Sequence, residues 1–216
     1  SFNFTTDESS PDFEVVAVDP EMLGQIFESL LAKEIDETNE QSNKRSKTGA
    51  FYTPKYIVNY ICTESLRQHL YRELSNDSFN EGVDRLLDYS DSEFMAAKSS
   101  STNEFLWGVN TKRVLPKVVK ALKSVKIIDP AVGSGAFPIG MMQVLTKLFE
   151  RLLPATEFDP FHIKLHIIEN NLYGVDINPM ATEIARLRTW LSLTVEEITN
   201  HNVIEPLPNL DFKFVS

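Results

Sequence analysis

The feature that most constrains the fold is an apolar run that breaks into glycines between Lys126 and Gly140 (KIIDPAVGSGAFPIG). Lys126 to Asp129 is typical of a short strand that ends in an acid, and Gly133 and Gly135 let the backbone turn tightly and approach a ligand. Pro138 suits the first turn of a following helix. This order predicts the start of a nucleotide-binding α/β domain, with a glycine turn of any doubly wound sheet as the alternative.

The ligand class is narrowed by two further observations. Pro138 stands where the third glycine of the dinucleotide fingerprint would be, so a diphosphate cofactor is not the first expectation. Leu172 to Asn178 (LYGVDIN) indicates a second strand, whose terminal Asp176 is placed to bind a ribose while Ile177 lies against an adenine. These features predict an adenosyl ligand. A helix N-cap or turn role is the alternative for Asp176.

A third motif lies upstream, in residues 48–62 (TGAFYTPKYIVNYIC). Thr53 and Pro54 are typical of a helix start, and Ile57, Val58 and Ile61 begin the buried stripe behind it. Free backbone N–H groups and the positive end of the helix dipole at that turn suit a carboxylate. Taken alone, the motif is also that of an ordinary capped helix.

Together, the three motifs resemble the adenine-specific (N6) DNA methyltransferases of restriction–modification systems, especially the large fused type II methylase and nuclease chains. In that family a Tyr-Thr-Pro segment precedes an Asp-Pro-Ala-x-Gly-Ser-Gly-x-Phe loop, and the ribose-binding acid follows. Here they stand as residues 52–54, residues 129–137 and Asp176. The opening DPEMLG of residues 19–24 also resembles the helical lead-in of those chains, so the resemblance covers residues 19–216.

The resemblance implies S-adenosylmethionine as the cofactor and double-stranded DNA as the partner of the complete protein. Thr53 would bind the methionine carboxylate, the glycine loop the rest of the methionine part, and Asp176 with Ile177 the ribose and adenine. The expected cofactor-binding residues are Tyr52, Thr53, Asp129, Ala131, Gly133, Ser134, Gly135, Phe137, Asp176 and Ile177.

No catalytic residue is assigned. The family's catalytic loop is Asn-Pro-Pro-Tyr (or Phe), which accepts hydrogen bonds from the amino group of a flipped adenine, and the chain contains no Pro-Pro pair. Asn178-Pro179 follows the ribose acid directly, so it is interpreted as a strand-to-helix turn. Residues 211–216 (DFKFVS) indicate a third strand before the expected loop. We therefore expect an N-terminal, cofactor-binding fragment that is inactive alone.

Composition agrees with a cytoplasmic protein. The 216 residues are 42% hydrophobic, enough for one sizeable core, and neither an 18-residue apolar run nor a secretory signal is visible, so no membrane association is expected. The single Cys62 excludes intramolecular disulfides and cysteine zinc sites and is predicted to be a packed thiol. His162 and His166 are spaced for a metal but lack an acidic partner, so no metal site is expected.

Charge is spread unevenly along the chain, whose net charge is −10. Residues 1–48 and 125–216 are acidic, whereas residues 49–124 carry nine acids and ten bases. The net charge and the pI of 4.9 argue against this piece alone holding DNA. In the middle, five cations at nearly helical spacing indicate a solvated helix face, with phosphate contact in the complete protein as the alternative: Lys112, Arg113, Lys117, Lys120 and Lys123.

The predicted fold class is α/β, a Rossmann-like methyltransferase core with a partial parallel sheet after a helical N-terminal region. Residues 1–48 would form a helical lead-in, with a helix over residues 20–34 and a polar linker over residues 37–47. Residues 49–124 would carry the Thr-Pro motif, and residues 125–216 the cofactor core. Strands are predicted at residues 126–129, 172–176 and 212–215.

Two other functions remain open on these residues. A methyltransferase acting on RNA or protein would share the glycine loop, although the Tyr52-Thr53-Pro54 segment and the lead-in favour DNA. A non-catalytic helical interaction module would have lost its ligand, although Asp129, Asp176 and both glycines speak against that. No oligomeric state is indicated by the sequence.

Overall fold

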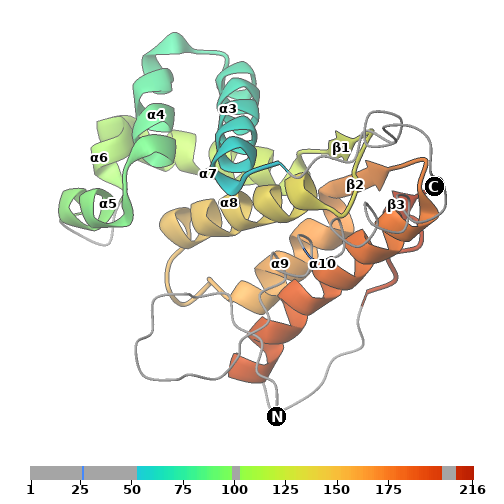
Figure 1. Ribbon diagram of the computed structural model, residues 1–216. Helices are drawn as coiled ribbons and strands as arrows, with labels where there is room; N and C mark the ends of the chain where they lie inside the picture. Colours follow the sequence, from blue (N-terminus) through green and yellow to red (C-terminus); the bar gives the residue numbers. More distant parts are fainter. Residues whose placement is uncertain (1–25, 27–52, 99–102, 201–207) are drawn as a thin grey trace. The chain divides into compact units, whose positions relative to one another are not determined.

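The computed structural model describes residues 26, 53–98, 103–200 and 208–216, which Figure 1 shows in colour. Tyr52, the linker over residues 37–47 and the helix over residues 20–34, apart from Ile26, lie outside the described residues. The remaining predicted elements can be compared with the structure.

Helices form most of the described chain. Ahead of the sheet come α3 (Lys55–Leu74), α4 (Asn80–Asp88), α5 (Asp91–Ala97), α6 (Glu104–Trp107) and α7 (Thr111–Ser124), with 3₁₀ turns η1 (Asp77–Phe79) and η2 (Gly108–Asn110). In α3 every fourth residue is buried, from Val58 through Cys62, Leu66 and Leu70 to Leu74. This is the spacing that places apolar side chains on one face of a helix. Cys62 is thus the packed thiol that the sequence predicts.

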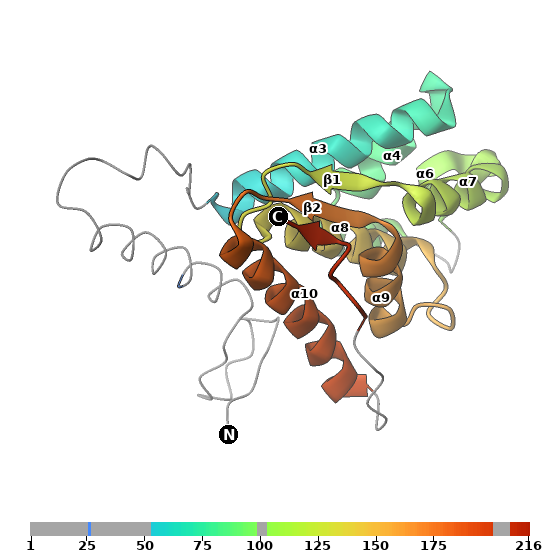
Figure 2. The same cartoon turned by 90° about the vertical axis from the view of Figure 1, so that its right-hand side faces the viewer.

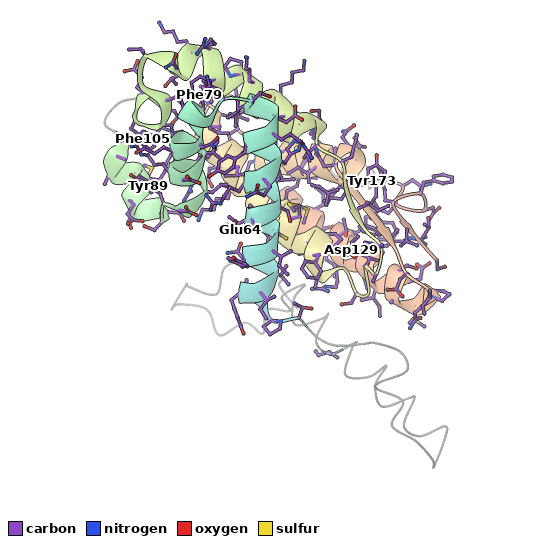
Figure 3. The ribbon with its side chains drawn as sticks, turned by 90° about the horizontal axis from the view of Figure 1, so that it is seen from above. Glu64, Phe79, Tyr89, Phe105, Asp129 and Tyr173 are labelled. Atoms are coloured by element: carbon purple, nitrogen blue, oxygen red, sulfur yellow. The ribbon has the colours of Figure 1, made fainter. Side chains whose placement is uncertain are left out.

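The helices α4 and α6 approach closely because Gly82 has no side chain. A Cβ built at Gly82 would stand 2.2 Å from Nε1 of Trp107, so the indole occupies that space. Trp107 is buried, and its Nε1–H donates to the Phe79 carbonyl at 3.2 Å. Figure 3 labels Phe79, Tyr89 and Phe105 in this helical region, where the rings of Tyr89 and Phe105 stack with centroids 6.4 Å apart. Trp107 is therefore a packing anchor between these two helices.

A three-stranded sheet follows, with β1 (Ile127–Asp129), β2 (Leu172–Val175) and β3 (Phe214–Val215) in chain order. Helices α8 (Ala136–Leu152) and α9 (Pro160–Asn170) connect β1 to β2, and α10 (Pro179–Asn200) leads from β2 towards β3. β2 and β3 are parallel, with Gly174 opposite Phe214. Each strand lies within two residues of its predicted range.

Helix α10 packs against β3, and Figure 2 shows it below that strand. Arg186 of α10 fixes this arrangement, because its Nε–H donates to the Phe214 carbonyl at 3.1 Å. Phe214 itself is buried, and a Cβ at Gly174 would lie 2.8 Å from its ring and 2.7 Å from Val132. Gly174 therefore lets the glycine loop and β3 close over the middle strand.

The described residues divide into two compact units that are both discontinuous in sequence. One contains residues 128–139 and 173–216 together with the chain up to Lys55, and the other contains residues 56–127 and 140–172. A predominantly helical chain with a small sheet of consecutive βα units is an α/β fold, so the predicted class is confirmed. The Rossmann-like core and the division at residues 48 and 124 stay predictions.

Candidate functional site

The glycine loop joins β1 to α8 and is held by backbone hydrogen bonds. The Val132 N–H donates to the Val175 carbonyl at 2.9 Å, which fastens the loop to the end of β2. The Gly135 N–H donates to the Val132 carbonyl at 2.9 Å, and the Gly135 carbonyl accepts from Ile139 in the first turn of α8. Strand, loop and helix thus follow one another as the sequence predicts, with Pro138 in the first turn.

The two positions of the loop need glycine for different structural reasons. Both have positive φ, +52° at Gly133 and +89° at Gly135, a conformation that glycine adopts without the steric cost borne by other residues. A Cβ at Gly135 would stand 3.1 Å from the Cβ of Ala185, so this glycine lets the loop pack on α10. Nothing lies within 4 Å of a Cβ at Gly133. The backbone at Gly133 is therefore open to a ligand.

Asp129 ends β1 with one carboxylate oxygen paired and the other not. Oδ1 accepts from the Ala131 N–H at 3.0 Å, while Oδ2 is buried and has no hydrogen-bond partner among the described residues. Burial raises the pKa of this carboxyl; the Ala131 hydrogen bond opposes that rise, and repulsion from Asp176 adds to it. Figure 3 labels Asp129 beside the loop. A donor or a cation at Oδ2 would relieve the cost of its burial.

Asp176 follows β2 and clasps the same loop. Its Oδ2 accepts from the Gly133 N–H at 2.8 Å, and its Oδ1 accepts from the Asn178 N–H at 2.9 Å. Its own N–H donates to the Val215 carbonyl at 3.0 Å, which extends the β2–β3 pairing. Asp176 therefore has the turn role predicted as its alternative, and it also contacts the glycine loop. Each carboxylate oxygen can accept a further hydrogen bond.

The turn after Asp176 opens α10. Asn178 occupies the position before the helix, where its Oδ1 accepts from the Met180 N–H at 3.0 Å, as an N-cap side chain does. The interpretation of Asn178-Pro179 as a strand-to-helix turn is confirmed. Ile177 is 94% exposed, so its apolar side chain is free to lie against a flat ligand. Ala131 is also exposed, and Phe137 is half-buried in the first turn of α8.

Ser134 is fixed by a residue that sequence reasoning missed. Arg188 of α10 is 3% exposed and donates through Nη1 to the Ser134 carbonyl at 2.7 Å and to its Oγ at 3.0 Å. The buried positions Ala181, Ile184 and Ala185 continue to Arg188 and Ser192 at helical spacing. A charged residue on this mostly apolar stripe was the signal that could have singled out Arg188.

The third motif is described only in part. Thr53 and Pro54 are half-buried and precede α3, which begins at Lys55, one residue later than the predicted first helical position. The basic residues of α7 are all exposed, as predicted for a solvated face. Among the described residues, no three His, Cys, Asp or Glu side chains gather to hold a metal ion, and no helix is long and apolar enough to cross a membrane.

Comparison with known proteins gives the family. Residues 105–208 match the model of the MmeI DNA-methyltransferase domain. A protein of Methanocaldococcus jannaschii, named as a type II restriction enzyme and methyltransferase, is 33% identical over 98% of this chain. The adenine-specific methyltransferase PglX of Lacticaseibacillus casei is 27% identical over 75% of the chain, and that of Streptomyces coelicolor is 36% identical over 31%.

The chain is a relative of the restriction–modification adenine methyltransferases. It spans 17%, 13% and 5% of the lengths of these three relatives, respectively. The resemblance inferred from its motifs is confirmed. The glycine loop of residues 129–137 and Asp176, which is hydrogen-bonded to it, both lie within the residues that match the methyltransferase model.

Proposed function

We propose that this chain is the S-adenosylmethionine-binding part of a site-specific N6-adenine DNA methyltransferase. One observation carries the proposal. The Gly133 N–H donates to Asp176 Oδ2 at 2.8 Å, so the loop after β1 and the acid after β2 form one structure at one edge of the sheet. Ligands of open α/β sheets bind at this carboxyl edge.

The residues present suit that cofactor. S-adenosylmethionine supplies an electrophilic methyl group, and it carries an ammonium, a carboxylate and a ribose with two hydroxyl groups. The unpartnered Oδ2 of Asp129 suits the ammonium, and the remaining lone pairs of Asp176 suit the ribose hydroxyls. The open backbone at Gly133 leaves room for the methionine part, and exposed Ile177 offers an apolar surface to the adenine.

Further contacts are proposed for the remaining residues. Ala131, Ser134, Gly135 and Phe137 shape the loop, with Ser134 held from behind by Arg188. Thr53, at the start of α3, would receive the carboxylate with the help of Tyr52, because free N–H groups and the helix dipole favour an anion at such a turn.

Methyl transfer needs more than this chain contains. The printed sequence has no Asn-Pro-Pro-Tyr loop to accept hydrogen bonds from the adenine amino group, and its relatives are several times longer. An adenine in duplex DNA must also be flipped out of the stack before it reacts. We therefore propose that these 216 residues bind the cofactor without methylating DNA, and that duplex DNA is the substrate of the longer protein.

Thermal unfolding with added ligands tests this function. A ligand that binds only the folded state raises the midpoint as its concentration passes the dissociation constant. We expect S-adenosylmethionine and S-adenosylhomocysteine to raise the midpoint, NAD to leave it unchanged, and labelled methyl groups to stay off DNA. Stabilisation by NAD instead would favour a dinucleotide site, and methylated DNA would overturn the role assigned to the absent loop.

A further inference from the structure

One face of α7 carries a cluster of positive charge. Its sequence, TKRVLPKVVKALKS, contains five cations and no acid. On an ideal helix with about 100° per residue, these cations fall within an arc of about 140°. They are Lys112, Arg113, Lys117, Lys120 and Lys123, and all five are exposed. We call this arc the α7 basic face.

The opposite side of α7 is buried and fixes the orientation of the basic face. Thr111, Val114, Val118, Ala121 and Leu122 are buried, and α7 packs against α6 and α9. These positions occupy an arc of about 100° that does not overlap the basic one. The helix therefore presents its cations to solvent without a change of structure.

Among the described residues, several other cations have a counter-charge that the lysines of this face lack. Arg67, Arg85 and Arg186 each form an ion pair with a nearby acid. Lys147 forms one with Asp91. In the part of the chain that the structure describes, no ion pair or side-chain hydrogen bond is found for Lys112, Lys117, Lys120 or Lys123. In contrast, Arg113 donates to Asn110 and lies over the Phe79 ring.

We propose that the α7 basic face contacts the phosphate backbone of duplex DNA. The inference rests on the proposed function and adds to it the surface that holds the substrate. From Lys112 to Lys123 the helix rises about 16 Å, which matches about five phosphates of one strand at about 3.4 Å of axis per phosphate. Five cations and no acid over that length fit a polyanion, and lysines without partners release DNA counterions without first breaking an ion pair.

The test compares two triple variants of the whole chain that lose the same charge. Lys117→Gln/Lys120→Gln/Lys123→Gln alters the basic face, and Arg72→Gln/Lys98→Gln/Lys147→Gln alters exposed or partly exposed cations elsewhere on the chain. Binding to a fluorescent 20-base-pair duplex is followed by anisotropy from low to physiological salt. Circular dichroism checks that both variants stay folded.

We expect the unaltered chain to show a slope of log Kobs against log salt of about −4, and the α7 variant a slope smaller by about 2.7, since each lost phosphate contact removes about 0.9. At low salt the α7 variant should bind at least about tenfold more weakly, whereas the control keeps the original slope. Equal slopes in the two variants, or no duplex binding by the unaltered chain, would overturn the proposal.

Two further arms separate this inference from its alternatives. Binding of phosphatidylserine vesicles with no binding of duplex would show a membrane surface instead and overturn it. Both variants should retain the S-adenosylmethionine affinity of the unaltered chain. Failure to bind that cofactor would count against the proposed function alone, while intact cofactor binding with equal salt slopes would count against the basic face alone.

Discussion

Gly133 and Gly135 provide a matched pair of alanine substitutions at the residue scale. Gly135→Ala forces a Cβ to 3.1 Å from Ala185 at φ +89°, and we expect it to lower the free energy of unfolding by about 2 to 4 kcal/mol. Gly133→Ala places its methyl group in open space at φ +52°, so the loss should be only about 1 kcal/mol.

Chemical denaturation of the two variants measures this difference, and ligand titration adds a second contrast. The methyl group of Gly133→Ala fills the space proposed for the methionine part, so cofactor affinity should fall in this variant although it is the more stable one. Equal losses of stability in the two variants would contradict the distinct reasons assigned to the two glycines.

The ionised Asp129 carboxylate is expected to lower the stability of the folded chain and to strengthen cofactor binding. Its folded-state pKa lies above the ordinary 3.8 because its carboxyl is buried, so its ionisation costs the folded state stability as pH rises from 3.8 through the raised value. Asp129→Asn removes that cost and keeps an acceptor for the Ala131 N–H. The variant should therefore gain stability over the unaltered chain towards neutral pH, and bind S-adenosylmethionine less tightly.

Urea unfolding at about pH 3 and about pH 7 checks the sign of this effect. The two proteins should differ least at the lower pH, where both carry a neutral side chain. A variant that is less stable at neutral pH would show that the ionised carboxylate has a stabilising partner and would remove the reason for placing an ammonium there.

At the scale of elements, Arg188 joins α10 to the glycine loop. Arg188→Met keeps a long apolar stem but leaves the Ser134 carbonyl and hydroxyl without this donor, so we expect a loss of about 2 to 4 kcal/mol. Ser134→Ala removes only the hydroxyl contact and should cost about 1 kcal/mol. Arg72→Met, at an exposed position of α3, is the control, and it should stay within about 0.5 kcal/mol of the unaltered chain.

Arg151 has the corresponding role at the end of α8. It is 6% exposed and donates to the Leu86 carbonyl at 2.7 Å, the Tyr89 carbonyl at 2.6 Å and Asp91 at 2.7 Å. Arg151→Met should destabilise by about 2 to 4 kcal/mol, because two carbonyls lose their donor. Lys147→Met is the matched control: it removes only a partly exposed ion pair with Asp91 and should cost less than about 1 kcal/mol.

Asp91 adds a pH dependence to this contact. Hydrogen bonds from Lys147 and Arg151 lower its pKa below the ordinary 3.8. The stability that it contributes is present above 3.8 and is lost as the pH falls through the lower folded-state value. The difference between Arg151→Met and the unaltered chain should therefore shrink below that pH in denaturant titrations. A constant difference across the acid range would assign the effect to the carbonyl contacts alone.

The strands and the glycine loop could be predicted because their signals are local. Ile127, Ile128 and Asp129 stand directly before the turn, and the acid of the second strand repeats that order at Asp176. Gly174, Arg188 and Gly82 were missed because their roles depend on what faces them: Phe214 and Val132, Ser134, and Trp107. These partners lie far along the chain, and no spacing rule on a single sequence brings them together.

At the scale of the whole molecule, the two compact units do not follow the order of residues along the chain. The cofactor motifs that the structure describes all lie in the unit that contains residues 128–139 and 173–216, while most of the helical residues between them belong to the other unit. Sequence reasoning follows the chain and therefore favours contiguous domains. The separation of 47 residues between Asp129 and Asp176 exceeds the roughly 20 of a plain dinucleotide unit, and α8 and α9 occupy this length.

The most direct test of the central claim is a calorimetric titration of the 216-residue chain with S-adenosylmethionine, beside Asp176→Asn and Glu183→Gln. Both variants lose one negative charge, but only Asp176 contacts the loop, while Glu183 pairs with Arg186 on the exposed side of α10. We predict saturable binding with the unaltered chain and with Glu183→Gln, and a loss of at least about tenfold, or about 1.4 kcal/mol, with Asp176→Asn. Equal affinity in all three proteins, or no binding by the unaltered chain, would contradict the account.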